Sequence, residues 1–155
     1  MRLNFLFPFF LTRAILPKLR MVAGPTQIVF IGSFAGDSYL PRLTPYGASK
    51  AFLKQLSHAL EFDERVWRPT NVSTMYVTVG SVVSGSHKAV EGLGYPTAEV
   101  FAKAMVDKFA CGRQVVVPWL VHAIQFWLVS VLPAIVAERT MAAEIKKEIE
   151  LMKRL

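Results

Sequence analysis

The chain has 155 residues, a length that suits one domain or part of one. Apolar residues make up 53% of it and charged residues 19%, which is too apolar for intrinsic disorder. The single cysteine, Cys111, excludes an internal disulfide framework, and no His/Cys cluster has metal-site spacing. The net charge of +7 comes mainly from basic residues near the two ends, and no run of basic residues is interleaved with aromatic residues, so we expect no nucleic-acid partner.

Helical and strand patterns alternate along the first half of the chain. A Gly24-Pro25 turn separates an apolar helical run from a short β-branched run. Thr44 is expected to cap the next helix, with Pro45 in its first position. The expected elements are a helix over 6–19, a buried strand over 27–32, a helix over 45–65 and a strand over 72–79.

The second half begins with a loop over 82–96, which is long enough to suggest a lid or binding segment. Thr97 is expected to cap the helix that follows. Further elements are expected over 98–109 (helix), 113–117 (strand), 119–132 (apolar helix) and 137–155 (amphipathic helix). Strands separated by helices predict an α/β fold with a doubly wound parallel sheet.

The segment 114–137 carries no Lys, Arg, Asp or Glu and is long enough to span a bilayer. Two prolines, Pro118 and Pro133, and several polar residues interrupt it. We therefore favour a strand followed by a membrane-surface or core-packed helix over a true membrane span.

Three residues form the pattern with the clearest chemistry. Tyr46 and Lys50 lie four apart on a predicted helix, so they share one face, and Ser33 follows a predicted strand thirteen residues before Tyr46. An ammonium at about 4 Å favours the phenolate by at most roughly 4 kcal/mol at an effective dielectric near 20. Such a phenol can donate a proton to a carbonyl oxygen while hydride reaches the carbon. The Ser33 hydroxyl, at the carboxyl end of a strand, can bond the same oxygen.

The segment 28–36 and the Tyr46-Gly47-Ala48-Ser49-Lys50 motif, at their spacing, resemble the short-chain dehydrogenase/reductase superfamily. Within it, the segments 11–17, 96–101 and 119–123 are most similar to the branch of 17β-hydroxysteroid dehydrogenases and very-long-chain 3-oxoacyl-CoA reductases. The resemblance implies an oxidoreductase acting on CH–OH groups.

The resemblance also implies roles for four residues. Tyr46 would be the acid/base, and Ser33 would orient the substrate carbonyl. Lys50 would bind the nicotinamide ribose and tune Tyr46, and Asn4 would hold a water that links Lys50 to solvent. Asn4, Tyr46 and Lys50 would therefore also contribute to cofactor binding.

The implied cofactor is NADP(H), with NAD(H) as the alternative. Val79 and Ser81 match positions that touch its nicotinamide end. Two departures from the family pattern stand out. The Pro-Gly that follows the second strand is replaced by Tyr76-Val77, and no segment resembles the Gly-rich turn that cradles the pyrophosphate.

Without that turn, the chain is expected to be the C-terminal half of a Rossmann-type fold, with about three strands, flanking helices and an apolar C-terminal helical segment. Residues 1–117 would form the partial catalytic half, and 118–155 the apolar and then amphipathic helices. We expect a truncated form that is weakly active or inactive by itself.

The expected substrate carries a keto or hydroxy group on a lipid-like body, as in a 3-oxoacyl-CoA or a steroid. The expected partners are a second copy, through the Tyr46 helix, and a membrane. The expected location is the endoplasmic reticulum membrane, or otherwise the cytoplasm. Two alternatives stay open: a non-catalytic remnant that binds a membrane or a full-length relative, and a small membrane-inserted protein that uses 119–135.

Overall fold

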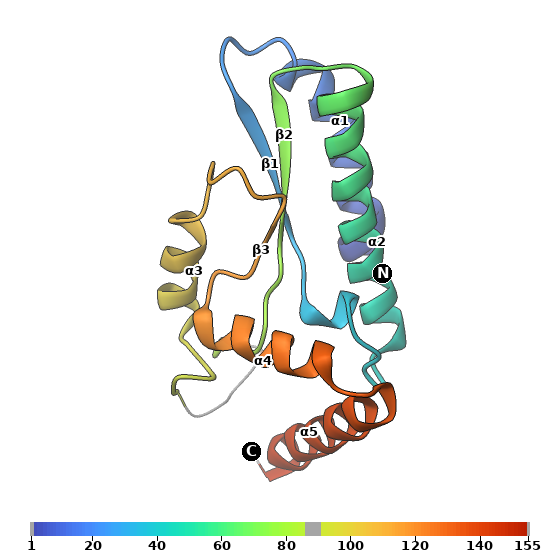
Figure 1. Ribbon diagram of the computed structural model, residues 1–155, viewed down its shortest axis with the longest axis vertical. Helices are drawn as coiled ribbons and strands as arrows, with labels where there is room; N and C mark the ends of the chain where they lie inside the picture. Colours follow the sequence, from blue (N-terminus) through green and yellow to red (C-terminus); the bar gives the residue numbers. More distant parts are fainter. Residues whose placement is uncertain (1, 86–90, 155) are drawn as a thin grey trace.

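A parallel three-stranded sheet forms the centre of the fold in the computed structural model, which describes residues 2–85 and 91–154 (Figure 1). The strands are β1 (Thr26–Ile31), β2 (Val72–Val77) and β3 (Val115–Val116), in the order β1-β2-β3. β1 pairs with β2 over its full length, and β3 pairs with the last two residues of β2. The predicted α/β fold with a parallel sheet is confirmed.

Helices cover both faces of this sheet. The helical elements are η1 (Arg2–Leu6), α1 (Phe7–Leu19), η2 (Phe34–Gly36), α2 (Thr44–Phe62), η3 (Asp63–Trp67), α3 (Ala98–Val106), α4 (Leu120–Val131) and α5 (Ala134–Arg154). α1 and α2 lie side by side on one face and α3 lies on the other, while α4 crosses below the carboxyl ends of the strands (Figure 1). This is the layered arrangement expected of a doubly wound sheet.

The alternation of side chains along the strands divides the core into two clusters. Toward α2, the buried residues are Phe30, Leu53, Leu60 and Tyr76. Toward α3, the buried residues are Met75, Val77 and Val116, with Met105 of α3 packed against them. β2 contributes to both clusters, which explains why it is buried almost throughout.

The start of α2 differs from the prediction. Thr44 was expected to be the cap, but Leu43 is the N-cap and Thr44 is already helical. Pro45 lies in the first turn as expected, and the Gly47 amide donates to the Leu43 carbonyl (2.8 Å). The backbone bond from Gly47 therefore starts the helix one residue earlier than the side-chain pattern indicates. Thr97 does cap α3, because its hydroxyl accepts the Val100 amide (3.3 Å).

The assignment of Tyr76-Val77 to the segment after the second strand is wrong. Both residues belong to β2 and are fully buried, and the strand ends at Val77 rather than Val79. The β-branched run continues through Val79, so the hydrophobic pattern alone overestimates the strand. Thr78 still donates its amide to Val116 (2.8 Å), and Gly80 follows in the loop.

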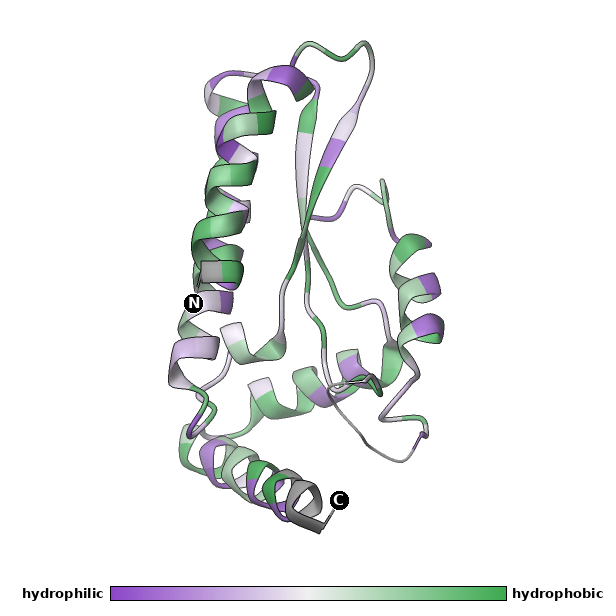
Figure 2. Ribbon diagram, turned by 180° about the vertical axis from the view of Figure 1, so that it is seen from behind, coloured by the Kyte–Doolittle hydropathy of each residue, from purple (hydrophilic) through white to green (hydrophobic). Residues whose placement is uncertain are grey.

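The C-terminal segment forms two helices separated at Pro133. Within residues 2–85 and 91–154, no helix combines the length and the apolar character needed to cross a membrane. Figure 2 shows hydrophobic colour along α4. The domain boundary between 117 and 118 stays a prediction.

Candidate functional site

Ser33 lies where β1 leaves the sheet. β1 ends at Ile31, and Ser33 has an extended backbone (φ −162°, ψ 153°). Its hydroxyl oxygen accepts the Ala35 amide at 3.2 Å and so caps η2. The serine therefore stands beyond the carboxyl end of a parallel strand, where open α/β sheets bind their ligands.

Tyr46 and Lys50 lie one turn apart near the start of α2. The Lys50 Nζ is 5.6 Å from the centroid of the Tyr46 ring, and it donates a hydrogen bond to the Ile31 carbonyl (2.9 Å). Burial lowers the pKa of Lys50 because the charged form loses solvation. Tyr46 remains partly exposed. The Lys50 ammonium therefore lies near the Tyr46 ring and is hydrogen-bonded to β1, the strand that precedes Ser33.

Gly47 allows this helical turn to approach Ser33. A Cβ at this position would be 2.9 Å from the Ala35 carbonyl oxygen, so a larger residue would push α2 away from η2. The structure therefore brings the three residues of the motif to one corner of the sheet. Among the residues described, no hydrogen bond joins the Ser33 and Tyr46 hydroxyls.

Ser33, Val79 and Ser81 line one cavity of about 500 Å³ at the carboxyl ends of the strands. The Phe34 amide donates to the Val79 carbonyl (3.0 Å), which holds the β1 and β2 loops together. The opposite wall comes from α4, the residue after it and α5, and it combines the apolar Phe126, Leu128, Val129, Leu132, Met141 and Ile145 with the polar Gln125, Thr140 and Glu144. The predicted nicotinamide contacts and the serine therefore share a cavity, whereas Tyr46 and Lys50 are not part of its wall.

Asn4 lies in η1, which packs against α2 through the Phe5 and Phe52 rings (4.1 Å between centroids). Its side chain is partly buried. Across the described part of the chain, no hydrogen bond connects Asn4 with Lys50. Its water-holding role stays a prediction.

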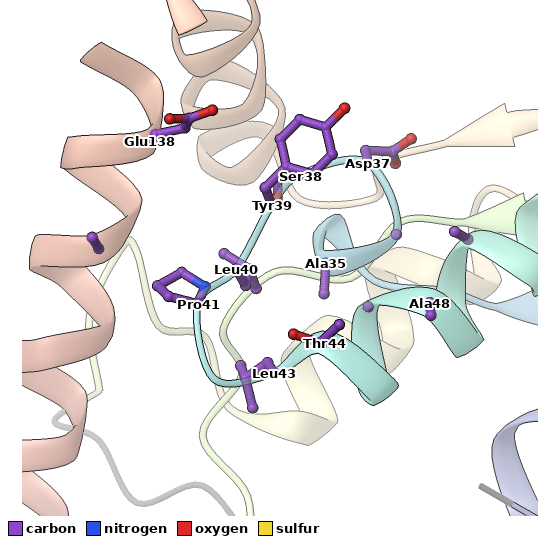
Figure 3. A pocket seen from close by; sticks show the side chains of 14 residues that line it. Ala35, Asp37, Ser38, Tyr39, Leu40, Pro41, Leu43, Thr44, Ala48 and Glu138 are labelled. Carbon is purple, nitrogen blue, oxygen red and sulfur yellow. The ribbon is translucent and has the colours of Figure 1, made fainter. Parts of the chain in front are cut away.

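A second cavity, of about 690 Å³, lies between the loop after η2, the first turns of α2, and α5. Figure 3 shows Glu138 projecting from α5 toward the segment that carries Tyr39. Leu40 and Leu43 line both this cavity and the one lined by Ser33, Val79 and Ser81, which we call the Ser33 cavity. Within the described ranges, no three His, Cys, Asp or Glu side chains are placed to share a metal ion.

The burial and the contacts of two residues at this end of the sheet were not predicted from the sequence. His122 of α4 is 1% exposed, and its Nε2 lies 3.1 Å from the Gly94 carbonyl. Burial lowers the pKa of His122, an effect opposed by the Gly94 and Ser81 carbonyls. The second residue, Tyr76, contacts both Ser33 and Lys50. Burial is what distinguishes these two residues. An isolated His or Tyr in a sequence gives no indication that its side chain is buried.

The profile of the short chain dehydrogenase family matches residues 1–91. A sulfoacetaldehyde reductase from Chromohalobacter salexigens is 48% identical over 52 residues, which are 34% of this chain and 21% of that protein. Serine dehydrogenase from Escherichia coli is 28% identical, with a TM-score of 0.43 over 81% of this chain and 42% of that one.

A short-chain dehydrogenase from Streptomyces avermitilis is 21% identical, with a TM-score of 0.46 over 95% of this chain and 57% of that one. The chain thus spans about a fifth of the reductase and about half of the two solved structures.

Proposed function

Because this chain belongs to the short chain dehydrogenase family, we propose that it provides the proton-transferring part of an NADP(H)-dependent oxidoreductase that interconverts keto and hydroxy groups. The single observation that carries the proposal is the Tyr46–Lys50 pair. The two residues lie one turn apart on α2. The Lys50 ammonium donates a hydrogen bond to the carbonyl of Ile31, the last residue of the strand that leads to Ser33.

The residues present suit the nicotinamide-ribose end of such a cofactor. The Lys50 ammonium has three donors, and the Ile31 carbonyl takes one of them, so ribose hydroxyls could accept the others. Val79 and Ser81 would border the nicotinamide in the Ser33 cavity. The cofactor, when bound, supplies or accepts the hydride. We choose NADP(H) over NAD(H), and the assay below separates them.

In the reductive direction, the substrate carbonyl would lie between Ser33 and Tyr46. The Ser33 hydroxyl donates a hydrogen bond to the carbonyl oxygen, and the Tyr46 phenol gives its proton to that oxygen as the carbon gains hydride. The resulting phenolate is stabilised by the nearby Lys50 ammonium and regains a proton from solvent. One hydride and one proton thus convert the keto group to an alcohol.

We further propose a lipid-like substrate, as in the 17β-hydroxysteroid dehydrogenase and 3-oxoacyl-CoA reductase branch. The support comes from the cavity next to Ser33, whose far wall on α4 and α5 has more apolar than polar side chains. Burying an acyl chain or steroid there would contribute about 25 cal/mol for each Å² of apolar surface removed from water. A small anionic substrate would gain little from this wall.

A spectrophotometric assay of the purified chain tests the proposal. NADPH oxidation is followed with 3-oxododecanoyl-CoA, androstenedione or sulfoacetaldehyde, and NADH replaces NADPH in a parallel series. We expect at most weak turnover, with one of the two lipid-like ketones, and a loss of about 10² or more of that turnover in Tyr46→Phe. Tyr39→Phe, which alters a tyrosine that is 86% exposed, is the matched control and should keep its activity.

The outcome with each substrate is decisive. Turnover with sulfoacetaldehyde alone would replace the lipid-like substrate with a small polar one. Full activity in Tyr46→Phe would refute the proposed chemistry, and absence of turnover with all three would favour the non-catalytic remnant instead.

We propose a second copy of the chain as a partner, bound through α2 and its neighbour α1. Large apolar side chains on this side are exposed: Phe7, Phe10, Leu11 and Phe62. Pairing would remove them from water. Light scattering should give the mass of two chains, and Phe10→Glu should shift it to one; a monomeric mass for the unaltered chain would exclude this dimer.

We also propose association with the endoplasmic reticulum membrane, supported by exposed apolar residues of α4: Leu120, Ile124, Trp127 and Val131. A helix of this kind can lie in the membrane surface. Cosedimentation with phosphatidylcholine/phosphatidylserine vesicles should fall in Trp127→Glu. Equal sedimentation of the two proteins, or none of either, would contradict it.

A further inference from the structure

Tyr76 is a polar residue that the proposed chemistry does not use, although it lies at the centre of the site. It is the fifth residue of β2, its side chain is 0% exposed, and it packs with Phe30, Leu53 and Leu60. A tyrosine hydroxyl in such a place needs partners, because an unbonded buried hydroxyl destabilises the fold. The hydrogen-bond partners of the Tyr76 hydroxyl indicate its role.

The hydroxyl of Tyr76 contacts the backbone of two site residues. It accepts the Ser33 amide at 3.2 Å, and its oxygen lies 3.3 Å from the Ser33 carbonyl and 3.3 Å from the Lys50 carbonyl. The single hydroxyl proton bonds one of these carbonyls at a time. One atom from the middle strand therefore touches both the exit of β1 and the α2 turn.

Two glycines make room for this side chain. A Cβ on Gly32 would be 2.0 Å from the Tyr76 Cζ. A Cβ on Gly36 would be 3.0 Å from the Tyr76 hydroxyl and 2.9 Å from the Lys50 carbonyl carbon. The backbone on both sides of Ser33 thus closes around the ring, and the ring fixes the distance between that backbone and α2.

We propose that Tyr76 is the positioning residue of the site, which fixes the Ser33 backbone relative to the helical turn that carries Tyr46 and Lys50. Its hydroxyl stays protonated through the neutral range, because burial raises the pKa of Tyr76 to about 12. The inference rests on the proposed function for its effect on turnover. Its effect on Lys50 is independent of that function.

The test compares Tyr76→Phe with Thr74→Val. Both variants remove a buried hydroxyl from β2 that bonds the backbone of α2. Thr74 bonds the Ser57 carbonyl (2.8 Å), two turns further along the helix than Lys50. Loss of a strand-to-helix hydrogen bond is therefore common to both, whereas loss of the contact with Ser33 is confined to Tyr76→Phe.

Two readouts are measured on the full chain. The first is kcat and KM for NADPH and 3-oxododecanoyl-CoA. The second is the rate at which acetyl N-hydroxysuccinimide labels Lys50 and, as a control, Lys103 of α3, read by peptide mass spectrometry. Labelling needs no turnover, so it decides the inference even if the proposed reaction is absent.

For Tyr76→Phe we expect kcat to fall about tenfold or more, with both KM values unchanged, since misplaced groups slow the chemical step. Lys50 labelling should rise roughly threefold or more, because the Lys50–Ile31 bond opens more often, while labelling of Lys103 in α3 stays constant. Thr74→Val should show neither change. Wild-type labelling of Lys50 in Tyr76→Phe, or equal changes in both variants, would overturn the inference.

A measurement on the unaltered chain covers the case in which Tyr76→Phe does not fold. The Ser33 amide has the Tyr76 hydroxyl as its partner, so its hydrogen exchange should be slowed by about 10² or more relative to an unstructured peptide. Unprotected exchange at Ser33 would overturn the inference without any variant.

Discussion

The helices α2 and α4 show how differently this chain uses apolar residues. α2 is the more polar of the two, yet it buries a stripe of Ser49, Leu53, Ser57 and Leu60 against the sheet. α4 is apolar on nearly all sides, yet within this fully described helix His122 is the buried residue. A helix is held in place by the match between its stripe and the sheet and not by its apolar content. The helix with the buried stripe, α2, carries Tyr46 and Lys50, and the more exposed α4 lines the cavity.

The largest expected effect comes from truncating the α2 stripe. Leu53, 4% exposed, packs with Phe30 and Tyr76, so Leu53→Ala should lower the free energy of unfolding by about 2–5 kcal/mol. The matched change in α4 is Leu120→Ala, where 73% of the leucine is exposed, and it should stay within about 0.5 kcal/mol. Urea denaturation of both variants measures this. Similar losses would abolish the contrast between the helices.

The packing around Tyr76 provides the next test. Gly32→Ala places a methyl group inside the Tyr76 ring, so the ring or the β1 exit must shift, at a cost of about 1–3 kcal/mol. Gly92→Ala meets nothing within 4 Å and should change stability little. Thermal unfolding followed by circular dichroism compares the two. An unchanged midpoint in Gly32→Ala would mean that the ring does not pack closely against Gly32.

The far end of α2 is anchored by an ion pair between Arg20, after α1, and Glu64 in η3. Glu64 is 1% exposed and also accepts the Thr70 hydroxyl (2.6 Å). Arg20→Met leaves this carboxylate without its cation and should cost about 1–3 kcal/mol at pH 7. Denaturant unfolding at this pH, with Arg13→Met as the control, measures the loss.

The same pair predicts a pH dependence. The Arg20 guanidinium holds the pKa of Glu64 below its usual range. A lowered carboxyl pKa gives stability above the unfolded value near 4.5, and this stability is lost as the pH falls through the folded value. The difference between wild type and Arg20→Met should therefore shrink below about pH 4.5. A difference that stays constant to pH 3 would contradict the assignment.

The smallest expected effect on stability comes from His122 in α4. Burial lowers the pKa of His122, so the unfolded chain binds a proton more readily than the folded one. Above the unfolded value of 6.5 the histidine is neutral in both states, and stability falls as the pH drops below that value. Between pH 7 and 5, His122→Gln should lose less stability than wild type, by less than about 1 kcal/mol. Parallel curves would rule out His122 as the source.

The sequence predicted the elements of the fold better than the contacts between them. The β-branched runs located β1 and the start of β2, and the Tyr46 and Lys50 spacing placed both residues on one turn. The end of β2 and the role of Tyr76 were not predictable, because a β-branched pattern continues past the last paired residue. Which face a strand tyrosine occupies, and what its hydroxyl meets, depends on residues more than 25 positions away.

The strand and helix predicted in the α4 region are present, but the small extent of burial of α4 was not predictable. Residues 114–137 resemble a membrane segment in composition, and composition carries no information on how much of a helix the sheet can cover. His122 is buried because Gly80 has no side chain: a Cβ there would be 2.8 Å from the His122 ring. Such a pairing of distant residues leaves no local pattern in one sequence.

The most direct test of the central claim, that Ser33 and Tyr46 act on one carbonyl oxygen, is a double-mutant cycle on kcat for the reduction of 3-oxododecanoyl-CoA by NADPH. Groups that act as a unit give non-additive losses. We therefore expect the combined Ser33→Ala and Tyr46→Phe variant to be little slower than Tyr46→Phe alone. Losses that multiply would show that the two residues act independently and would contradict the account.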